Sequence, residues 1–188
     1  MLGEADYREF SIRELAQRAN VSRATLYNLY GSRDKLAIAA VQNSLREIAD
    51  LVAAQNPEPG IDTLLTSSRI AAEQTLAYPQ YWRVMARVLL NADPEDEIVE
   101  ALYGPQRLTS VDQIEFARQA GQLRPDLDTI LFAQHLNAQA WGVTLSWFMG
   151  RFTDAQLVRE RMRSTISALV SVATGPAKKN LKAQLLCL

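Results

Sequence analysis

The spacing of apolar residues along the chain constrains its fold most, because they recur three and four positions apart through nearly its whole length. This is the period of an amphipathic α-helix, whereas a half-buried strand would carry an apolar residue at every second position. No segment shows sustained alternation of that kind between hairpin turns. The sequence therefore predicts an all-α fold.

Capping residues mark the first three predicted helices. A helix over 11–19 begins with Ser11, which forms a capping box with Glu14. Ser22 can cap a short second helix over 23–30, and Gly31 follows it as a left-handed C-cap would. A longer third helix is predicted from Ser32 to about residue 55.

The proline-rich linker 56–60 separates these helices from the rest of the chain. Five further helical segments are predicted behind it, at 61–77, 80–92, 95–122, 127–150 and 154–174. Gly104-Pro105 lies inside the third of these, which indicates two helices or one kinked helix. For the tail, 175–188, the pattern leaves open whether it docks as a helix or frays.

Composition excludes several classes of protein. The single cysteine, Cys187, allows no intramolecular disulfide or zinc site and indicates a reducing compartment. The first residues do not resemble a signal peptide, and no run of about 18 uncharged apolar residues could span a membrane. We therefore expect a cytoplasmic protein that makes no use of a membrane.

Catalytic motifs are missing from the sequence. It contains no nucleophile elbow, phosphate loop or dinucleotide fingerprint. The one histidine, His135, lies in an apolar helical segment and is expected to be a core or interface residue. The run Arg159-Glu160-Arg161-Met162-Arg163 is interpreted as a solvated helix face. We predict no catalytic residue, no metal site, no cofactor and no enzymatic activity.

The segment 11–35 combines two short helices, a tight turn and a local excess of positive charge. It holds five basic residues against two acidic ones, whereas the whole chain has a net charge of −1. Such a helix pair forms a helix-turn-helix, whose second helix enters the major groove of DNA. Leu26, and Leu29 or Tyr30, are expected to face inward, which leaves polar and small side chains on the outer face.

At this point the sequence resembles a known family. Phe10 to Ala16, Ala19 to Tyr30 and Ser32 to Leu36 are similar, almost without gaps, to the DNA-binding domain of TetR-family regulators. The stretch 120–128, Ala-Gly-Gln-Leu-Arg-Pro-Asp-Leu-Asp, resembles the loop ahead of the dimerising helices in such proteins. The resemblance implies a DNA-binding domain over 1–55, a helical effector-binding and dimerisation domain over 56–174, and a tail over 175–188.

The resemblance also implies roles for individual residues. Arg23 and Ala24 would face base edges, and Asn28 would read a base or a phosphate. Thr25 and Tyr27 would hold the DNA backbone, with contact to a thymine methyl as a second role open to Tyr27. Ser11 would anchor a phosphate, and Lys35 would hold the flanking strand. The predicted DNA-contacting set is Ser11, Ser22, Arg23, Ala24, Thr25, Tyr27, Asn28 and Lys35. Family members carry a full helix before this motif, so we expect that first helix to be truncated here.

The helical segment 127–150 carries two adjacent apolar stripes. Phe132, Leu136, Val143 and Trp147 form the first; Leu131, Ala138, Leu145 and Phe148 form the second. Two stripes indicate burial on two sides, one against the body and the other against a second copy, although a simple core helix is the alternative. The predicted dimerisation set is Phe132, Leu136, Val143, Trp147, Ile166, Leu169 and Val170.

Aromatic residues gather in the middle of the predicted effector domain. A mixture of this kind can line an apolar ligand cavity, although ordinary core packing would use the same residues. The predicted effector-binding set is Tyr78, Trp82, Met85, Tyr103, Phe116 and Trp141.

Together these features predict a homodimeric, sequence-specific DNA-binding regulator, a repressor that an unidentified small-molecule effector releases from a double-stranded DNA operator. An all-helical small-molecule carrier or sensor without DNA binding is the alternative, and an enzyme is the least favoured reading.

Overall fold

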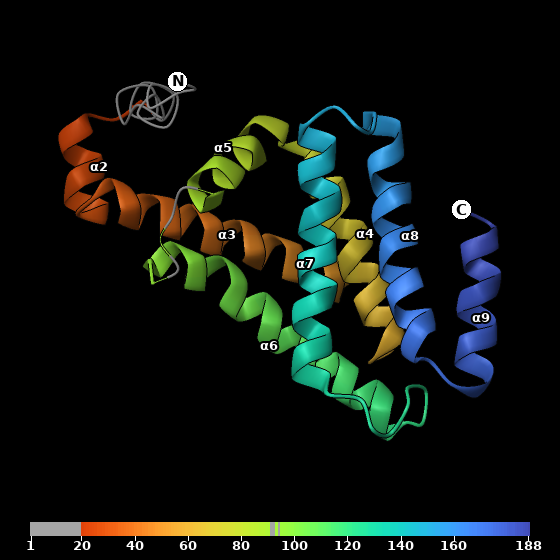
Figure 1. The fold of residues 1–188 in the computed structure, drawn as a ribbon. Coiled ribbons are helices and arrows are strands. Elements are labelled where there is room, and N and C mark those ends of the chain that lie inside the picture. The colour runs from red at the N-terminus through yellow and green to blue at the C-terminus, as the bar shows by residue number, and fades with distance from the viewer. Residues whose placement is uncertain (1–19, 91–92, 94) are drawn as a thin grey trace. The chain divides into compact units, whose positions relative to one another are not determined.

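The computed structural model describes residues 20–90, 93 and 95–188. The all-α prediction is confirmed (Figure 1). The helices of the described part are α2 (Arg23–Tyr30), α3 (Arg33–Ala54), α4 (Ile61–Ala77), α5 (Pro79–Leu90), α6 (Glu97–Gln119), α7 (Thr129–Phe148), α8 (Asp154–Val172) and α9 (Gly175–Leu186). The helix predicted over 11–19 lies outside the described residues.

Most helix bounds agree with the sequence prediction within a few residues, and α2 and α4 agree at both ends. α6 is one helix that continues through Gly104 and Pro105, which excludes two separate helices and leaves the predicted alternative of one kinked helix. Leu102 and Ile114, on either side of the proline, are fully buried and hold both halves of the helix, which offsets the hydrogen bond that proline removes. The tail, for which the sequence left docking and fraying open, forms the helix α9 with Pro176 in its first turn.

The described residues form two compact units. The first contains the described residues up to Arg46 together with those of Pro79–Gly104, and the second contains Glu47–Tyr78 and Pro105–Leu188. In the first unit the buried side chains include Leu26, Leu36, Val41, Trp82, Met85, Ile98 and Leu102. The predicted division at residue 55 separates a DNA-binding part from an effector-binding and dimerisation part. It remains a prediction, because it rests on what the two parts bind.

The second unit is a helical bundle. α7 and α8 run antiparallel and pack against each other, and α8 also packs against α4 and α9 (Figure 1). The main core cluster lies among these helices and includes Leu65, Leu136, Ile166 and Leu169. A smaller cluster contains Ala72, Trp147 and Leu157.

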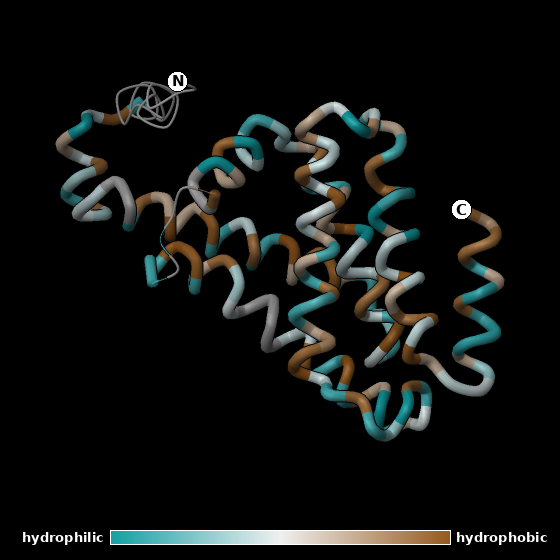
Figure 2. The backbone as a smooth tube through the Cα atoms, viewed as in Figure 1, coloured by the Kyte–Doolittle hydropathy of each residue, from teal (hydrophilic) through white to brown (hydrophobic). Residues whose placement is uncertain are grey.

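Helix α9 is part of the bundle core. Its Leu181 is 2% exposed and belongs to the main cluster, against which Leu185 and Leu188 also pack. Figure 2 shows hydrophobic residues in the last turns of this helix, near the C-terminus. The last residues of the chain therefore close the core of the second unit.

Backbone hydrogen bonds join the loop before α7 to the junction between α8 and α9. The amide of Arg124 donates to the carbonyl of Val172 over 2.9 Å, and the amide of Thr174 donates to the carbonyl of Gln122 over 2.9 Å. These bonds flank an antiparallel bridge between Leu123 and Ala173, both of which are buried. Segments about fifty positions apart in the sequence are thus fastened together.

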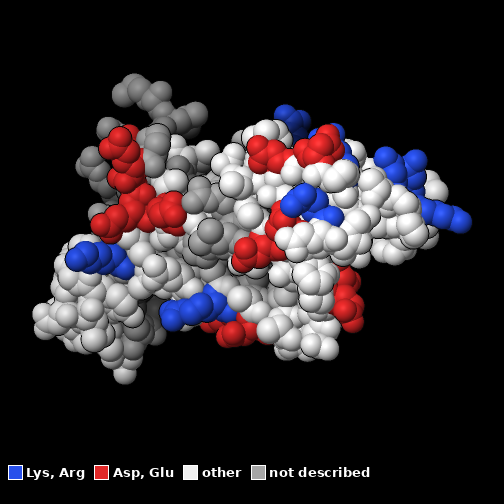
Figure 3. Space-filling view, turned by 90° about the horizontal axis from the view of Figure 1, so that it is seen from below, with Lys and Arg blue, Asp and Glu red and all other residues white. Residues whose placement is uncertain are grey.

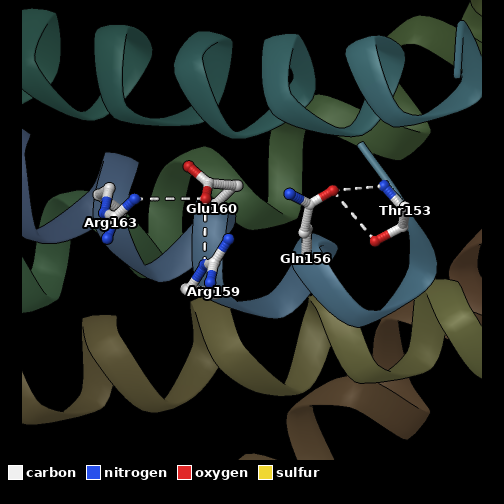
Figure 4. Close-up of polar contacts among 5 residues, drawn as sticks. All are labelled: Thr153, Gln156, Arg159, Glu160 and Arg163. Atoms are coloured by element: carbon white, nitrogen blue, oxygen red, sulfur yellow. Dashed lines mark hydrogen bonds and ion pairs between the residues drawn. The ribbon is translucent and has the colours of Figure 1, made fainter. Parts of the chain in front are cut away.

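The start of α8 is fixed by local polar contacts. Gln156 Oε1 accepts hydrogen bonds from the amide of Thr153 (2.9 Å) and from its hydroxyl (3.0 Å), as Figure 4 shows. The indole Nε1 of Trp147 donates to Asp154 Oδ1 over 2.9 Å and so ties the end of α7 to the first residue of α8. These contacts set the register between the two helices.

No helix in the described part of the chain is long and apolar enough to cross a membrane.

Candidate functional site

Helix α2 is defined by caps at both ends. Ser22 has an extended backbone, and its Oγ accepts a hydrogen bond of 3.0 Å from the amide of Thr25. Ser22 Oγ and Thr25 Oγ1 also lie 2.9 Å apart, within hydrogen-bond distance. At the other end, Gly31 has a φ of 76° and donates its amide to the carbonyl of Tyr27 over 2.7 Å. A side chain would strain that backbone, so glycine is favoured there.

The buried residue of α2 is Leu26, as predicted. Leu29 and Tyr30, either of which was expected to face inward, are instead 69% and 37% exposed.

The predicted DNA-contacting residues of α2 form an exposed surface. Arg23, Ala24, Thr25 and Asn28 are all exposed, and Tyr27 is 49% exposed. They occupy the first two turns of the helix, whose N-terminal end favours a phosphate. The side chains are therefore available to a ligand as large as a DNA duplex.

Lys35 lies on the first turn of α3 and is exposed. Its amide donates to Ser32 Oγ over 3.1 Å, so the helix start is capped beside it. The next residue, Leu36, is buried and holds that turn in place. Ser11, the remaining member of the predicted DNA-contacting set, lies outside the described residues.

Charged side chains of both signs occur on one face of the molecule. On the face drawn in Figure 3, basic and acidic side chains of the described residues are interspersed. This distribution agrees with a net charge of −1 and restricts any contact with a polyanion to a local surface.

The predicted effector-binding residues fall into two groups. Trp82 and Met85 are buried in the first unit, which also contains Tyr103 with 36% exposure. The second unit contains the other three, Tyr78 (57% exposed), Phe116 (48% exposed) and the partly buried Trp141. Within each unit some of these side chains are buried and others are accessible to solvent. Their role in ligand binding stays a prediction.

Most of the predicted dimerisation residues pack inside the protomer. Phe132, Leu136, Ile166 and Leu169 belong to the main core cluster, and Val170 packs against it. Trp147 belongs to the smaller cluster, with Val143 against it. These residues thus have the core role that the sequence offered as an alternative, and their part in a dimer stays untested.

The accessible side of α7 carries three of the four residues of the second apolar stripe, whereas the fourth, Phe148, packs against the smaller core cluster. Leu131 is 48% exposed, Ala138 is exposed, and Leu145 is partly exposed. Ile130 and Met149, at the two ends of the helix, are 58% and 72% exposed. His135, which was expected in a core or interface, is also exposed on this helix.

The structure corrects the position that the sequence analysis predicted for Arg161. Arg161 was interpreted as part of a solvated face, but its Nε has no accessible surface. The signal that could have placed it is the i+4 series Leu157, Arg161, Thr165 and Leu169, because the other three members are all buried. Arg161 therefore lies on the inward side of α8.

The first 40 residues match the family model described as bacterial regulatory proteins, tetR family. The HTH-type transcriptional repressor KstR2 of Mycobacterium tuberculosis (strain ATCC 25618 / H37Rv) is 25% identical over 155 residues, which cover 79% of this chain and 76% of that protein.

Solved structures agree along most of the chain. FadR of Thermus thermophilus, a TetR-family transcriptional repressor solved in complex with lauroyl-CoA, matches with a TM-score of 0.67 and 25% identity, covering 93% of this chain and 91% of FadR. A putative TetR-family transcriptional regulator from Rhodococcus sp. matches with a TM-score of 0.73 and 16% identity, covering 91% of each chain. The first 40 residues thus carry the sequence of the TetR-family DNA-binding segment, and the chain shares its fold with solved TetR-family regulators.

Proposed function

We propose that this regulator is a homodimeric repressor that reads its operator with helix α2 and leaves it when a small-molecule effector binds. The observation that carries the proposal is the exposed outer face of α2, formed by Arg23, Ala24, Thr25, Tyr27 and Asn28. The caps at Ser22 and Gly31 hold this helix without using any side chain of that face except the Thr25 hydroxyl.

In this proposal the contacts divide into two kinds. Arg23, at the start of α2, can donate two hydrogen bonds to the major-groove edge of a guanine, while the small Ala24 allows close approach. Thr25, Tyr27 and Lys35 bind phosphates and set the register of the helix on the duplex. Only the first kind carries sequence information.

A dimer would present two such helices to two half-sites. The surface we propose for it is the accessible side of α7 formed by Leu131, Ala138 and Leu145, extended by Ile130 and Met149 at its ends. An apolar helix side left open to water is a common partner surface, and a two-fold axis would pair it with its own copy.

The effector is proposed to act through helix α3. This helix begins beside Lys35 and ends at Ala54, in the second unit, so it runs from one unit into the other. A ligand that favours one arrangement of the second unit can thereby change the spacing of the DNA-reading helices. Because FadR of Thermus thermophilus was solved with lauroyl-CoA, an acyl-CoA is a suitable first compound for a release assay.

The test starts by selecting bound duplexes from a random library and from the DNA upstream of the protein's own gene, followed by gel-shift titration. Binding should weaken steeply as salt rises, because phosphate contacts release counterions. Arg23→Ala should cost about 1–3 kcal/mol on the selected site and relax the preference at one base pair.

Lys35→Ala is the matched variant, because it removes an equally exposed cation that is assigned only to a phosphate. It should weaken all sequences alike and lower the salt dependence by about one counterion. Equal losses for both variants on every duplex would contradict the assigned roles. Failure to select any duplex would leave a helical small-molecule sensor as the function.

A further inference from the structure

Three helices of the second unit each place polar side chains on their inward side at a similar level. They are Ser68 on α4, Thr144 on α7, and Arg161 and Thr165 on α8, which together we call the polar layer. The serine and threonine side chains are 9%, 3% and 4% exposed, in that order. Ser68 Oγ and Thr165 Oγ1 lie 2.7 Å apart, so the layer joins α4 to α8.

The polar layer lies between the two apolar clusters of the bundle. On α4, Ser68 falls between Leu65 of the main cluster and Ala72 of the smaller one. On α7, Thr144 falls between Leu136 and Trp147 in the same way. The core is therefore interrupted by a polar level with apolar packing on both sides of it.

Arg161 is the charged member of the polar layer. Its Nη1 donates to Thr144 Oγ1 over 2.8 Å, which joins α8 to α7. Its Nε is buried and has no hydrogen-bond partner within the part of the chain that the structure describes. The residue as a whole keeps some accessible surface, so part of the side chain can be reached from outside.

The neighbouring carboxylate does not neutralise Arg161. Glu160 Oε1 accepts from Arg159 Nε over 3.2 Å and from Arg163 Nη1 over 3.4 Å, as Figure 4 shows. Among the hydrogen bonds and ion pairs of the described residues, the Arg161 guanidinium has a hydroxyl as its partner and no carboxylate. Burial lowers the pKa of Arg161 to about 10, which reflects an uncompensated charge in the interior.

A buried cation without a counter-ion is costly, and the cost is recovered when an anion with matching geometry binds. The guanidinium fork suits a carboxylate, which can accept from two nitrogens at once. The hydroxyls of Thr144 and Thr165 donate to the carbonyls of Ala140 and Arg161 in this structure, and each can rotate to donate to a bound anion instead. The apolar clusters on either side suit a hydrocarbon body attached to it.

We propose that Arg161 binds the carboxylate of an apolar small-molecule acid, which is the effector, within the polar layer between α4, α7 and α8. This rests on the proposed function of an effector-released regulator and names the chemical class of the effector.

The experiment measures binding without DNA, by calorimetry and thermal midpoint, for the pairs octanoate and octanamide, laurate and lauramide, and benzoate and benzamide. At least one acid should bind the full chain about tenfold to a hundredfold more tightly than its neutral amide, as expected for a charge-assisted hydrogen-bonded pair. Arg161→Met should bind that acid and its amide alike.

Arg159→Met is the matched control, because it removes an arginine of the same helix whose side chain is 44% exposed. It should keep the preference for the acid. Without ligand, Arg161→Met should be at least as stable as the natural chain, since an apolar side chain replaces an unpaired buried charge. Arg161→Lys keeps the positive charge but cannot donate two parallel hydrogen bonds to one carboxylate, so it should bind the acid with intermediate affinity. If Arg161→Met does not fold, this variant provides the test in its place.

The proposal is overturned if none of the three acids is preferred over its amide, or if the preference survives in Arg161→Met. Release of DNA is measured separately by gel shift with the acid that binds. A preference that depends on Arg161 but leaves the DNA complex intact would refute effector release and keep the carboxylate site. If the natural chain without ligand binds no DNA, the DNA-binding role proposed for α2 is refuted and the carboxylate site is not.

Discussion

The carboxylate of Glu115, on α6, is held by two neighbouring side chains. Arg118 donates to both of its oxygens, over 2.6 Å from Nη2 and 2.9 Å from Nε, and Gln119 donates over 2.8 Å. These hydrogen bonds, the one from Arg118 first, lower the pKa of Glu115 to about 2. The charged form is therefore favoured in the folded chain.

This shift predicts a pH dependence of stability. Because the folded pKa lies below the unfolded value of about 4.3, the contribution of Glu115 is complete above that pH and is lost as the pH falls toward 2. Glu115→Gln should lower the thermal midpoint slightly at pH 5 to 8, and the difference from the natural chain should shrink below pH 4.

Asp126→Asn is the control for this measurement. Asp126 is 75% exposed and lies 3.8 Å from Arg124, so its pair should add little to the thermal midpoint at any pH. A Glu115→Gln difference that is as large at pH 3 as at pH 7 would contradict the role assigned to the hydrogen-bonded carboxylate.

At the scale of single elements, α9 should contribute strongly to the stability of the second unit. Leu181→Ala would leave a cavity in the main cluster and should lower the free energy of unfolding by about 2–5 kcal/mol, measured by urea denaturation. Leu186→Ala, on the same helix, removes a side chain that is 88% exposed and should change that energy by less than about 0.5 kcal/mol. Equal effects of the two variants would mean that α9 does not dock.

The helix bounds could be predicted where local chemistry sets them. Ser22 and Gly31 fix α2 from within a few residues, and their cap geometry is that expected from sequence. The tail could not be assigned, because the buried Leu181 and the partly buried Leu185 and Leu188 make too short a stripe to distinguish a docked helix from a frayed one. Its docking depends on α8, whose position the tail sequence does not encode.

The candidate site was predictable to a similar extent. The outward set on α2 follows from its caps and from one inward residue, Leu26, whereas the two stripes of α7 are both apolar. Which stripe packs inside depends on contacts with α4 and α8, and these bury Phe132 and Leu136 rather than Leu131. The prediction for Arg161 was wrong for the same reason. It stands in a run of charged residues, and only the packing of α8 shows that its side chain points inward.

At the scale of the whole molecule, the proposed pairing through α7 predicts the effect of one charge. Leu131→Glu should weaken self-association by about 2–4 kcal/mol, because two carboxylates would be desolvated across a two-fold axis. The helix itself should tolerate the change, since residue 131 lies in its first turn, where a negative charge is favourable. The measurement is the mass distribution in sedimentation equilibrium, with affinity for selected DNA as the second readout.

Ala183→Glu places the same charge at an exposed position of α9 and should leave the mass distribution unchanged. A Leu131→Glu protein that remains dimeric at micromolar concentration would place the partner surface elsewhere.

The bonds that fasten Arg124 to Val172 and Thr174 to Gln122 have a consequence for the opening of the fold. They join segments about fifty positions apart and flank the buried residues Leu123 and Ala173, so they cannot break by fraying at the end of one helix. The amides of Arg124 and Thr174 should therefore exchange hydrogen for deuterium only when the second unit opens as a whole.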